Sequence, residues 1–565
     1  MSFGFGAVIQ VGVGVSTMES EQHCALQSGQ SNVSTKMSAA KDKDKDDQSF
    51  YDSALSAKLA AEDERLESPN PLPAPPSAES VAADVPWWHK QKCRLIIIAT
   101  VLGMVVAVAI VVPLVLAQTS VTGGDDNDQQ NNGASTELTS RKNPEREAII
   151  ADRLALVTPG GNETLMEPNT PQYRAWQWLV YDDEMKLDPT ADNLQQRYLL
   201  MVIHFPSMMD ESDDGQQWGS PVHECEWEEV QCKNKMDLMD EYEQDNTTWI
   251  DDAPERIVTG LTLSQRLNGQ IPVELSLLLF LQHLNLENNK LIGSLPSHIY
   301  DLHKLDTLLL SQNQLSNIDD IGEIKHLERL SMSMNNFQGP LPTSFQNLKH
   351  LKTLDLHTNE FTGDLFEVID DFESLEVIDV AFNDFSGTIS PLIGKMTNLT
   401  TLLLGNNQFS GGIPEEIQFC NKLQDLSVEA NHDMGGIVPS VLGQLTFLVY
   451  LSLSTCSFEG PLPASFGDLT ELKFLDVTFN NLDGALPKEL GSAKSLTTLG
   501  LAYNEFDGSI PSEFGLLTSL EELVIQSTNL KGVMPQEICT LRQEGVLNSI
   551  TASCDNLACT CCDCS

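Results

Sequence analysis

Apolar residues recur along the second half of the chain in one short pattern. A well-preserved copy places Leu351, Leu354 and Leu356 ahead of Asn359, and related copies follow one another over residues 281–528. Alternation of apolar and variable residues over five positions predicts a short, half-buried strand. In such a strand the leucines point inward and the variable residues face out.

A second signal follows each copy of this pattern, an apolar residue and then proline at a nearly fixed step of 24 residues. Weakened copies without the proline stand at Ile318, Leu365 and Ile389, so that twelve copies run without a break. A period of this size predicts a solenoid of stacked repeats instead of a globular enzyme core. The intact dipeptides are Ile271-Pro272, Leu295-Pro296, Leu341-Pro342, Ile413-Pro414, Val438-Pro439, Leu462-Pro463, Leu486-Pro487, Ile510-Pro511 and Met534-Pro535.

Asparagine closes most copies, and its amide is suited to satisfy main-chain groups where each coil turns. A glycine before the dipeptide, such as Gly363, permits a positive φ, and the proline fixes an extended return segment. The asparagines are Asn289, Asn313, Asn335, Asn359, Asn383, Asn407, Asn431, Asn480 and Asn504.

Together these residues resemble the plant-type leucine-rich repeat, as found in receptor ectodomains and polygalacturonase-inhibitor-like proteins. The resemblance covers residues 257–535 and implies an α/β solenoid, a leucine-rich repeat superhelix with short parallel strands on its concave face. Departures are local: Cys456 and Thr528 replace the asparagine, and Arg266 replaces it in the opening copy.

Cysteines stand at both ends of the repeats, where a solenoid exposes apolar cross-sections that need capping. Cys225 and Cys232 flank Trp227 after a helical stretch at residues 193–205. They resemble the plant-type N-terminal cap, whose two cysteines pair, and we assign residues 145–256 to this helical cap region. A zinc site is the alternative, but it lacks a nearby second ligand pair.

Six more cysteines crowd the last residues, 536–565, which we interpret as a Cys-rich C-terminal cap. An even number in a short tail predicts three bridges among fifteen connectivities, with a metal-thiolate cluster as the alternative. This Cys-rich ending resembles that of membrane-anchored repeat proteins of unicellular algae. The six are Cys539, Cys554, Cys559, Cys561, Cys562 and Cys564.

Residues 95–117 form an uncharged apolar run long enough for a single transmembrane helix. Basic residues precede it, whereas the polar linker 118–144 carries acidic residues close to the run. The positive-inside rule predicts a cytosolic N-terminus and extracellular repeats, a signal-anchored single-pass type II protein of the plasma membrane. The cytosolic tail, residues 1–94, is typical of a disordered segment because it has little to bury.

The chain has a formal net charge of −48, which excludes nucleic acid as a partner. Sequons at Asn162, Asn246 and Asn398 are consistent with a glycosylated ectodomain.

No catalytic motif is present: the 94-residue tail lacks the Gly-rich loop, H-R-D and D-F-G of a kinase. His283, His357 and His432 occupy variable repeat positions without zinc-binding spacing such as H-E-x-x-H. We therefore expect no enzyme activity, no cofactor and no metal.

Surface recognition remains, because variable strand positions present side chains in register on a solenoid. Later copies place aromatic residues there, which are typical interface anchors, although packing within the repeat is an equal alternative. We expect a receptor-like protein that binds an extracellular peptide, glycan or protein. Its other expected partners are the lipid bilayer and a separate cytosolic or membrane signalling partner. The alternative is a membrane-tethered structural, adhesive or wall-enzyme-inhibitor protein. The candidate ligand-binding residues are Phe382, Tyr450, Phe474, Phe479 and Tyr503.

Overall fold

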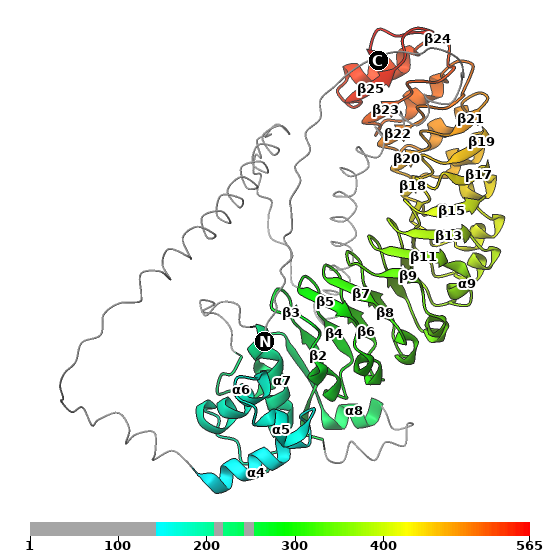
Figure 1. Ribbon diagram of the computed structural model, residues 1–565. Helices are drawn as coiled ribbons and strands as arrows, with labels where there is room; N and C mark the ends of the chain where they lie inside the picture. Colours follow the sequence, from blue (N-terminus) through cyan, green and yellow to red (C-terminus); the bar gives the residue numbers. More distant parts are fainter. Residues whose placement is uncertain (1–142, 208–217, 242–252, 565) are drawn as a thin grey trace, which may run out of the picture. The chain divides into compact units, whose positions relative to one another are not determined.

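The computed structural model describes residues 143–207, 218–241 and 253–564 (Figure 1). The predicted tail 1–94, the apolar run 95–117 and nearly all of the linker 118–144 lie outside these residues. Within the described ranges, none of the helices combines the length and the apolar character needed to cross a bilayer.

Short helices form the N-terminal part of the described chain. Asn143 caps the first helix by accepting a hydrogen bond from the Arg146 N–H, and Thr170 caps the third by accepting from the Tyr173 N–H; proline follows each cap. The elements are α4 (Pro144–Ala155), α5 (Gly161–Leu165), α6 (Pro171–Gln177), the π-helical turn η2 (Trp178–Asp182), α7 (Leu194–Ser207), η3 (Glu224–Glu226) and α8 (Lys235–Glu241).

Arg197, on α7, organises this helical part from a fully buried position. Its guanidinium donates to both carboxylate oxygens of Asp183, at 2.9 and 3.0 Å, and lies 3.6 Å from a carboxylate oxygen of Glu224. The guanidinium also lies over the Trp227 ring, at 4.6 Å from the centroid. A buried charge is tolerated when it is paired and hydrogen-bonded in this way.

The repeats build most of a 15-stranded sheet, in which each repeat coil contributes one short strand beside the next. All its pairings are parallel except β1 with β2. The strands are β1 (Val230–Asn234), β2 (Arg256–Thr262), β4 (His283–Asn285), β6 (Thr307–Leu309), β8 (Arg329–Ser331), β10 (Thr353–Asp355), β12 (Val377–Asp379), β14 (Thr401–Leu403), β16 (Asp425–Ser427), β18 (Tyr450–Ser452), β20 (Phe474–Asp476), β22 (Thr498–Gly500), β23 (Glu522–Val524), β25 (Ser549–Ala552) and β27 (Asp563–Cys564).

Most coils also contain a second strand, of two to five residues. In Figure 1 these strands run beside the long sheet from β3 to β21. They form three sheets: β3 (Asn268–Gly269), β5 (Lys290–Ser294) and β7 (Gln314–Asn317); β9 (Gln338–Pro340), β11 (Glu360–Asp364), β13 (Asp384–Thr388), β15 (Gln408–Gly411), β17 (Asp433–Ile437), β19 (Ser457–Pro461) and β21 (Asn481–Asp483); and β24 (Gly532–Val533) with β26 (Leu557–Ala558).

Proline marks the start of a 3-10 turn in most coils. Pro342, for example, has an extended backbone, with ψ of 147°, and caps the turn Thr343–Asn347. The copy at Leu365 lacks the proline, and there a short α-helix, α9 (Phe366–Ile369), replaces the 3-10 turn. The remaining turns are Val273–Leu277, Ser297–Asp301, Ile321–Glu323, Pro391–Lys395, Glu415–Phe419, Ser440–Gln444, Ala464–Asp468, Lys488–Ser492 and Ser512–Leu516, and α10 (Gln536–Gln543) follows the last dipeptide.

The asparagine ladder predicted from the sequence is confirmed. Asn359 Oδ1 accepts from the Phe337 N–H of the preceding coil at 3.0 Å. Its amide donates at 3.0 Å to the carbonyls of Met332 in that coil and Leu356 in its own. One side chain thus satisfies main-chain groups of two coils and joins them. The positive φ expected of the turn glycines is also present, with 86° at Gly363.

The long sheet continues beyond residue 535, where the sequence pattern of repeats ends. Strand β25 pairs in parallel with β23, and Leu547 and Ile550 are buried as the repeat leucines are. These two apolar residues complete one more coil within the Cys-rich segment, so the segment adds strands to the sheet.

Candidate functional site

The long sheet has one face toward the solenoid interior and one face away from it. In β20 the middle residue, Leu475, is completely buried, whereas its neighbours Phe474 and Asp476 are partly exposed. We call the surface made by the first and third residues of each strand, with the turn that follows, the outward face. Because adjacent strands pair in register, equivalent residues form rows across it.

Tyr450 and Phe474 are neighbours in the first-residue row, in β18 and β20. Their rings stack with centroids 4.5 Å apart and planes 7° apart. Phe479 and Tyr503 form a second pair in the turns after β20 and β22, with centroids 4.1 Å apart and planes 9° apart. Four of the five predicted aromatic residues therefore meet in two stacked pairs on adjacent coils.

The second pair is exposed and its backbone is strained. Phe479 and Tyr503 keep 46% and 39% of their surface accessible. Their φ angles are 55° and 54°, in the left-handed region that bulky residues rarely occupy. Ring stacking between them stabilises this arrangement. Packing against the core alone does not account for side chains that remain this exposed.

Phe382 lies apart from both pairs. It follows β12, and the strands β14, β16 and β18 separate that coil from β20. It shares the left-handed backbone, with φ of 57°, and is half-buried. The structure thus brings four of the predicted residues together and leaves the fifth in a different part of the sheet.

Carboxylates lie on the strands and turns next to the Tyr450–Phe474 pair. Asp425 pairs in register with Tyr450 on the next strand. Glu429 accepts a hydrogen bond from the Ser452 hydroxyl at 2.6 Å, and Asp476 accepts from the Thr478 N–H at 2.8 Å. Apolar rings beside carboxylates suit a ligand that carries both apolar and cationic groups.

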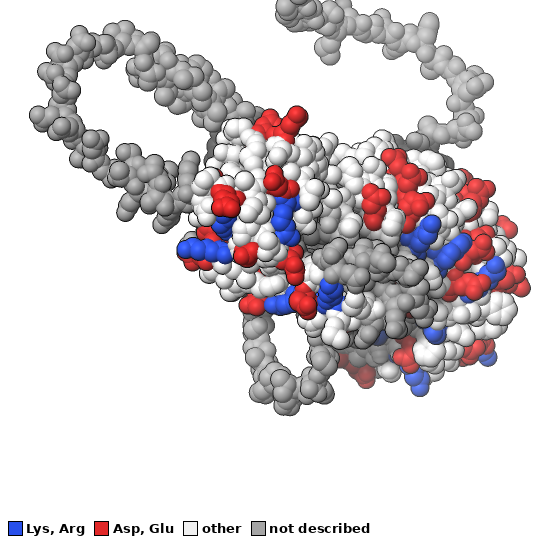
Figure 2. Space-filling model, turned by 90° about the horizontal axis from the view of Figure 1, so that it is seen from below, with Lys and Arg blue, Asp and Glu red and all other residues white. Residues whose placement is uncertain are grey.

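Figure 2 shows Asp and Glu side chains over much of the described surface in view, with Lys and Arg among them. Some of these charges are paired across coils, as Lys352 is with Glu328, both about half exposed. Exposed pairs of this kind contribute little to stability. The excess of acidic residues therefore affects which partners the chain can bind more than it affects the stability of the fold.

A buried polar cluster lies elsewhere on the outward face and escaped the sequence analysis. Asp355 ends β10, Asp379 ends β12, and His357 follows Asp355 by two residues. His357 Nδ1 is 2.7 Å from Asp355 Oδ1 and 3.5 Å from Asp379 Oδ2. The sequence signal was an aspartate two residues before a histidine, with a second aspartate one repeat further along the chain. Only the parallel register of the strands brings these three residues together.

Asp355 is ionised despite its position. Burial alone would raise the pKa of Asp355, but the charge of His357, with hydrogen bonds from His357, Ser331 and Ser333, holds that pKa below its ordinary value. The two serine hydroxyls come from β8 and the residue two beyond it, in the preceding coil.

Disulfides involve eight of the cysteines in the described chain. Cys225 is bonded to Cys232, beside the helical part. In the Cys-rich end Cys539 pairs with Cys561, Cys554 with Cys564 and Cys559 with Cys562. This is one of the fifteen connectivities that the sequence left open.

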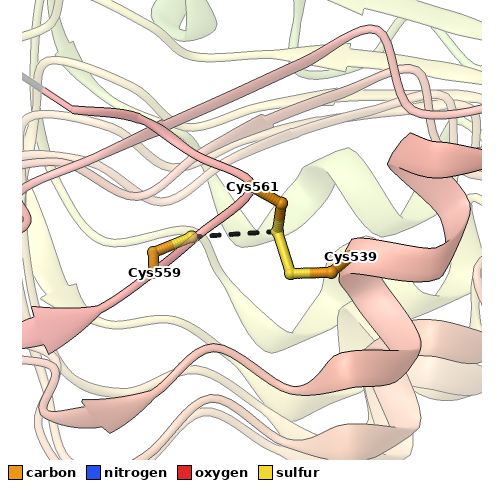
Figure 3. A group of neighbouring side chains, drawn as sticks. All are labelled: Cys539, Cys559 and Cys561. Atoms are coloured by element: carbon orange, nitrogen blue, oxygen red, sulfur yellow. Dashed lines mark hydrogen bonds between the residues drawn. A yellow bond between two sulfur atoms is a disulfide. The ribbon is translucent and has the colours of Figure 1, made fainter.

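Two of these bridges lie against each other. Figure 3 shows Cys539 on α10 bonded to Cys561, with Cys559 Sγ 3.8 Å from Cys561 Sγ. Their sulfurs are close enough to share an ion as thiolates. As disulfides they are not thiolates, which are the form that binds metals, so the pairing favours bridges over the metal-thiolate alternative.

Cys420 and Cys456 are free and buried. Burial raises the pKa of each thiol to about 12, so both stay protonated at neutral pH.

The sequons differ in accessibility. Asn162 lies exposed on α5, and Asn398 is half-buried and accepts a hydrogen bond from Lys422 Nζ at 2.7 Å. Asn246 lies outside the described residues.

Comparison with known proteins identifies the repeats. The family profile described as Leucine Rich Repeat matches residues 280–302, 326–348, 398–420, 447–469 and 495–517, so the chain contains leucine-rich repeats. No curated protein sequence matches the chain significantly.

Solved structures of receptor ectodomains are similar to the chain. The crystal structure of a TDR receptor is 33% identical over 53% of this chain and 51% of that chain, with a TM-score of 0.50. The ectodomain of the Arabidopsis receptor kinase HAESA with an extended IDA peptide hormone is 29% identical over 56% and 51%, with a TM-score of 0.50. HAESA with IDA and the co-receptor SERK1 is 27% identical over 61% and 55%, with a TM-score of 0.51. The chain spans about half the length of these receptor chains.

Proposed function

We propose that this chain is a non-catalytic, cell-surface leucine-rich repeat protein that binds an extracellular peptide or protein ligand on its outward face. The observation that carries the proposal is the exposed stack of Phe479 on Tyr503, held on a left-handed backbone. Aromatic side chains that stay exposed and stack on each other serve well as interface anchors.

The surroundings of the Tyr450–Phe474 pair support a more specific proposal for the ligand. Asp425, Glu429 and Asp476 place carboxylates beside Tyr450 and Phe474. A peptide segment with an apolar or aromatic residue next to lysine or arginine matches this surface, because rings take the apolar group and carboxylates pair with the cation.

The receptor structures support the same function. HAESA was solved in complex with the peptide hormone IDA, and its ectodomain resembles this chain in fold and sequence. Binding of a peptide is established there for that protein, and for this chain it remains our proposal.

The ends of the solenoid act as caps in this proposal. Gln196 on α7 accepts a hydrogen bond from the Val258 N–H of β2 at 2.8 Å, and Gln172 on α6 donates to Glu274 at 2.6 Å. These contacts support a helical N-terminal cap, and the three disulfides beyond residue 535 support a C-terminal one. Membrane anchoring through residues 95–117, with the repeats outside the cell and glycans on the sequons, completes the proposal.

Binding tests should use peptides selected from a random display library against the full chain purified in detergent. We expect Phe479→Ala to weaken the binding of the selected peptides, measured by fluorescence anisotropy, about tenfold or more. Phe447→Ala is the matched control, because Phe447 is also exposed but precedes β18 outside the outward face. Equal effects of the two substitutions, or none, would contradict the proposal.

A further inference from the structure

Asp355, His357 and Asp379 converge from two neighbouring coils of the solenoid. Strands β10 and β12 are parallel, and their register places Asp355 directly beside Asp379. His357 lies at the next outward position after Asp355, so its ring reaches the same place. The three side chains form a mixed cluster of one imidazole and two carboxylates, and all are buried, with 3%, 9% and 5% of their surface exposed.

The distances match the coordination sphere of a small divalent ion. One imidazole nitrogen and one oxygen from each carboxylate all lie within 4.8 Å of one another. Ligands bonded at about 2.0–2.2 Å to zinc stand roughly 3.3–3.6 Å apart in a tetrahedral sphere. The separation of 3.5 Å from His357 Nδ1 to Asp379 lies in that range, and the separation of 2.7 Å to Asp355 is a hydrogen-bond distance that would lengthen when an ion replaces the proton.

Hydrogen bonds hold each carboxylate so that one oxygen faces the cluster. Asp355 Oδ2 accepts from the hydroxyls of Ser331 and Ser333, at 2.5 and 2.8 Å, and its Oδ1 faces His357. Asp379 Oδ1 accepts from the Ala381 N–H at 3.0 Å, and its Oδ2 faces His357. Outer hydrogen bonds of this kind orient the ligands of metal sites.

We propose that Asp355, His357 and Asp379 bind a divalent transition-metal ion, with zinc as the preferred ion. The donors are Nδ1 of His357 and the facing oxygens Oδ1 of Asp355 and Oδ2 of Asp379. An imidazole with two carboxylates suits zinc, cobalt or manganese, whereas calcium requires six or more oxygen ligands. The site lies several coils away from the aromatic pairs and does not depend on the proposed ligand.

Zinc titration of the full chain, purified in detergent under oxidising conditions and treated with chelator, tests the assignment. Calorimetry should detect a zinc site that Asp379→Asn and His357→Gln each weaken by about 100-fold or more, and that Ser333→Ala weakens by about tenfold. Asp476→Asn is the matched control, because Asp476 ends β20 as Asp379 ends β12 and also accepts from the N–H two residues on. It should leave this affinity unchanged.

Two further readouts separate a lost site from a lost fold. Zinc should raise the melting temperature of the wild type and of Asp476→Asn, but not of Asp379→Asn or His357→Gln. Cobalt should give the visible absorption bands of a bound ion with nitrogen and oxygen ligands, and these bands should disappear in the same two variants. Absence of a zinc site in the wild type, or affinity unchanged in folded Asp379→Asn and His357→Gln, would overturn the proposal.

Discussion

The phenyl ring of Phe479 stacks on the phenol ring of Tyr503, and both residues have a left-handed backbone. The same turn position has a positive φ in every coil from Gln265 to Ser527, with residues as different as Met334 and Ala430. Repeat geometry therefore imposes this backbone whatever the side chain. The aromatic residues are not needed to form the turn, so their place on the outward face is available for binding.

Leu475 and Phe479 should separate stability from binding within one coil. Leu475→Ala leaves a cavity in the core and should cost about 2–5 kcal/mol. Phe479→Ala removes an exposed, mutually stacked ring and should cost only about 0.5–1 kcal/mol. Thermal melting of the two purified variants measures both. A similar loss of stability in both would mean that the aromatic pairs are packing elements.

The asparagine ladder can be tested with two adjacent asparagines. Asn407 Oδ1 accepts from the Phe385 N–H at 2.9 Å, and its amide donates to Val380 and Leu404 carbonyls at 2.9 and 3.1 Å. Asn407→Ala leaves buried main-chain groups unsatisfied and should cost about 2–4 kcal/mol.

Asn406 is the control for that substitution. It is only half-buried and has φ of 55°, a conformation that glycine adopts freely. Asn406→Gly should change the unfolding free energy by less than about 1 kcal/mol in the same denaturant titration. A larger loss at Asn406 than at Asn407 would refute the ladder as the link between coils.

His204 should make the helical part sensitive to acid. Its pKa falls to about 4 because burial disfavours the charged form and Arg266 and Arg174 repel it. Below the ordinary value of 6.5 the unfolded chain takes up a proton that the folded chain does not, so stability is lost as pH falls from 6.5 towards 4. At pH 5 the loss relative to pH 7 should be about 2 kcal/mol.

His204→Phe checks the origin of this acid sensitivity. Phenylalanine retains a ring against Trp218, on which His204 stacks at 5.5 Å, but cannot take up a proton. Urea denaturation at pH 7 and pH 5 should show a smaller difference in the variant, by about 2 kcal/mol. An unchanged difference would assign the acid sensitivity to other groups.

The proposed membrane topology rests on the charges around residues 95–117. Lys90, Lys92 and Arg94 precede this run, so an epitope at the N-terminus should be stained only after cells are permeabilised. An antibody to the Cys-rich end should stain intact cells. The reverse pattern would overturn the proposed orientation.

Replacing residues 1–94 by an unrelated soluble sequence should abolish the output of a receptor and leave the function of an adhesive or inhibitory protein unchanged.

The sequence by itself determined the repeat fold. Periodic leucines, asparagines and prolines act locally, since each coil repeats the same contacts with its neighbours, and Asn359 and Gly363 behave in the structure as the pattern predicts. It also singled out the aromatic residues, because variable positions of a strand are defined by the same period.

Only the tertiary structure decided which of these residues meet. Tyr450 stacks on Phe474, and Phe479 on Tyr503, while Phe382 stands apart, because the alignment of coils and not the chain order sets these neighbours. The pairing of Cys539 with Cys561 likewise depends on how α10 packs against the chain end. Asp355 and Asp379 become neighbours through strand register, a long-range relation that no local pattern of residues encodes.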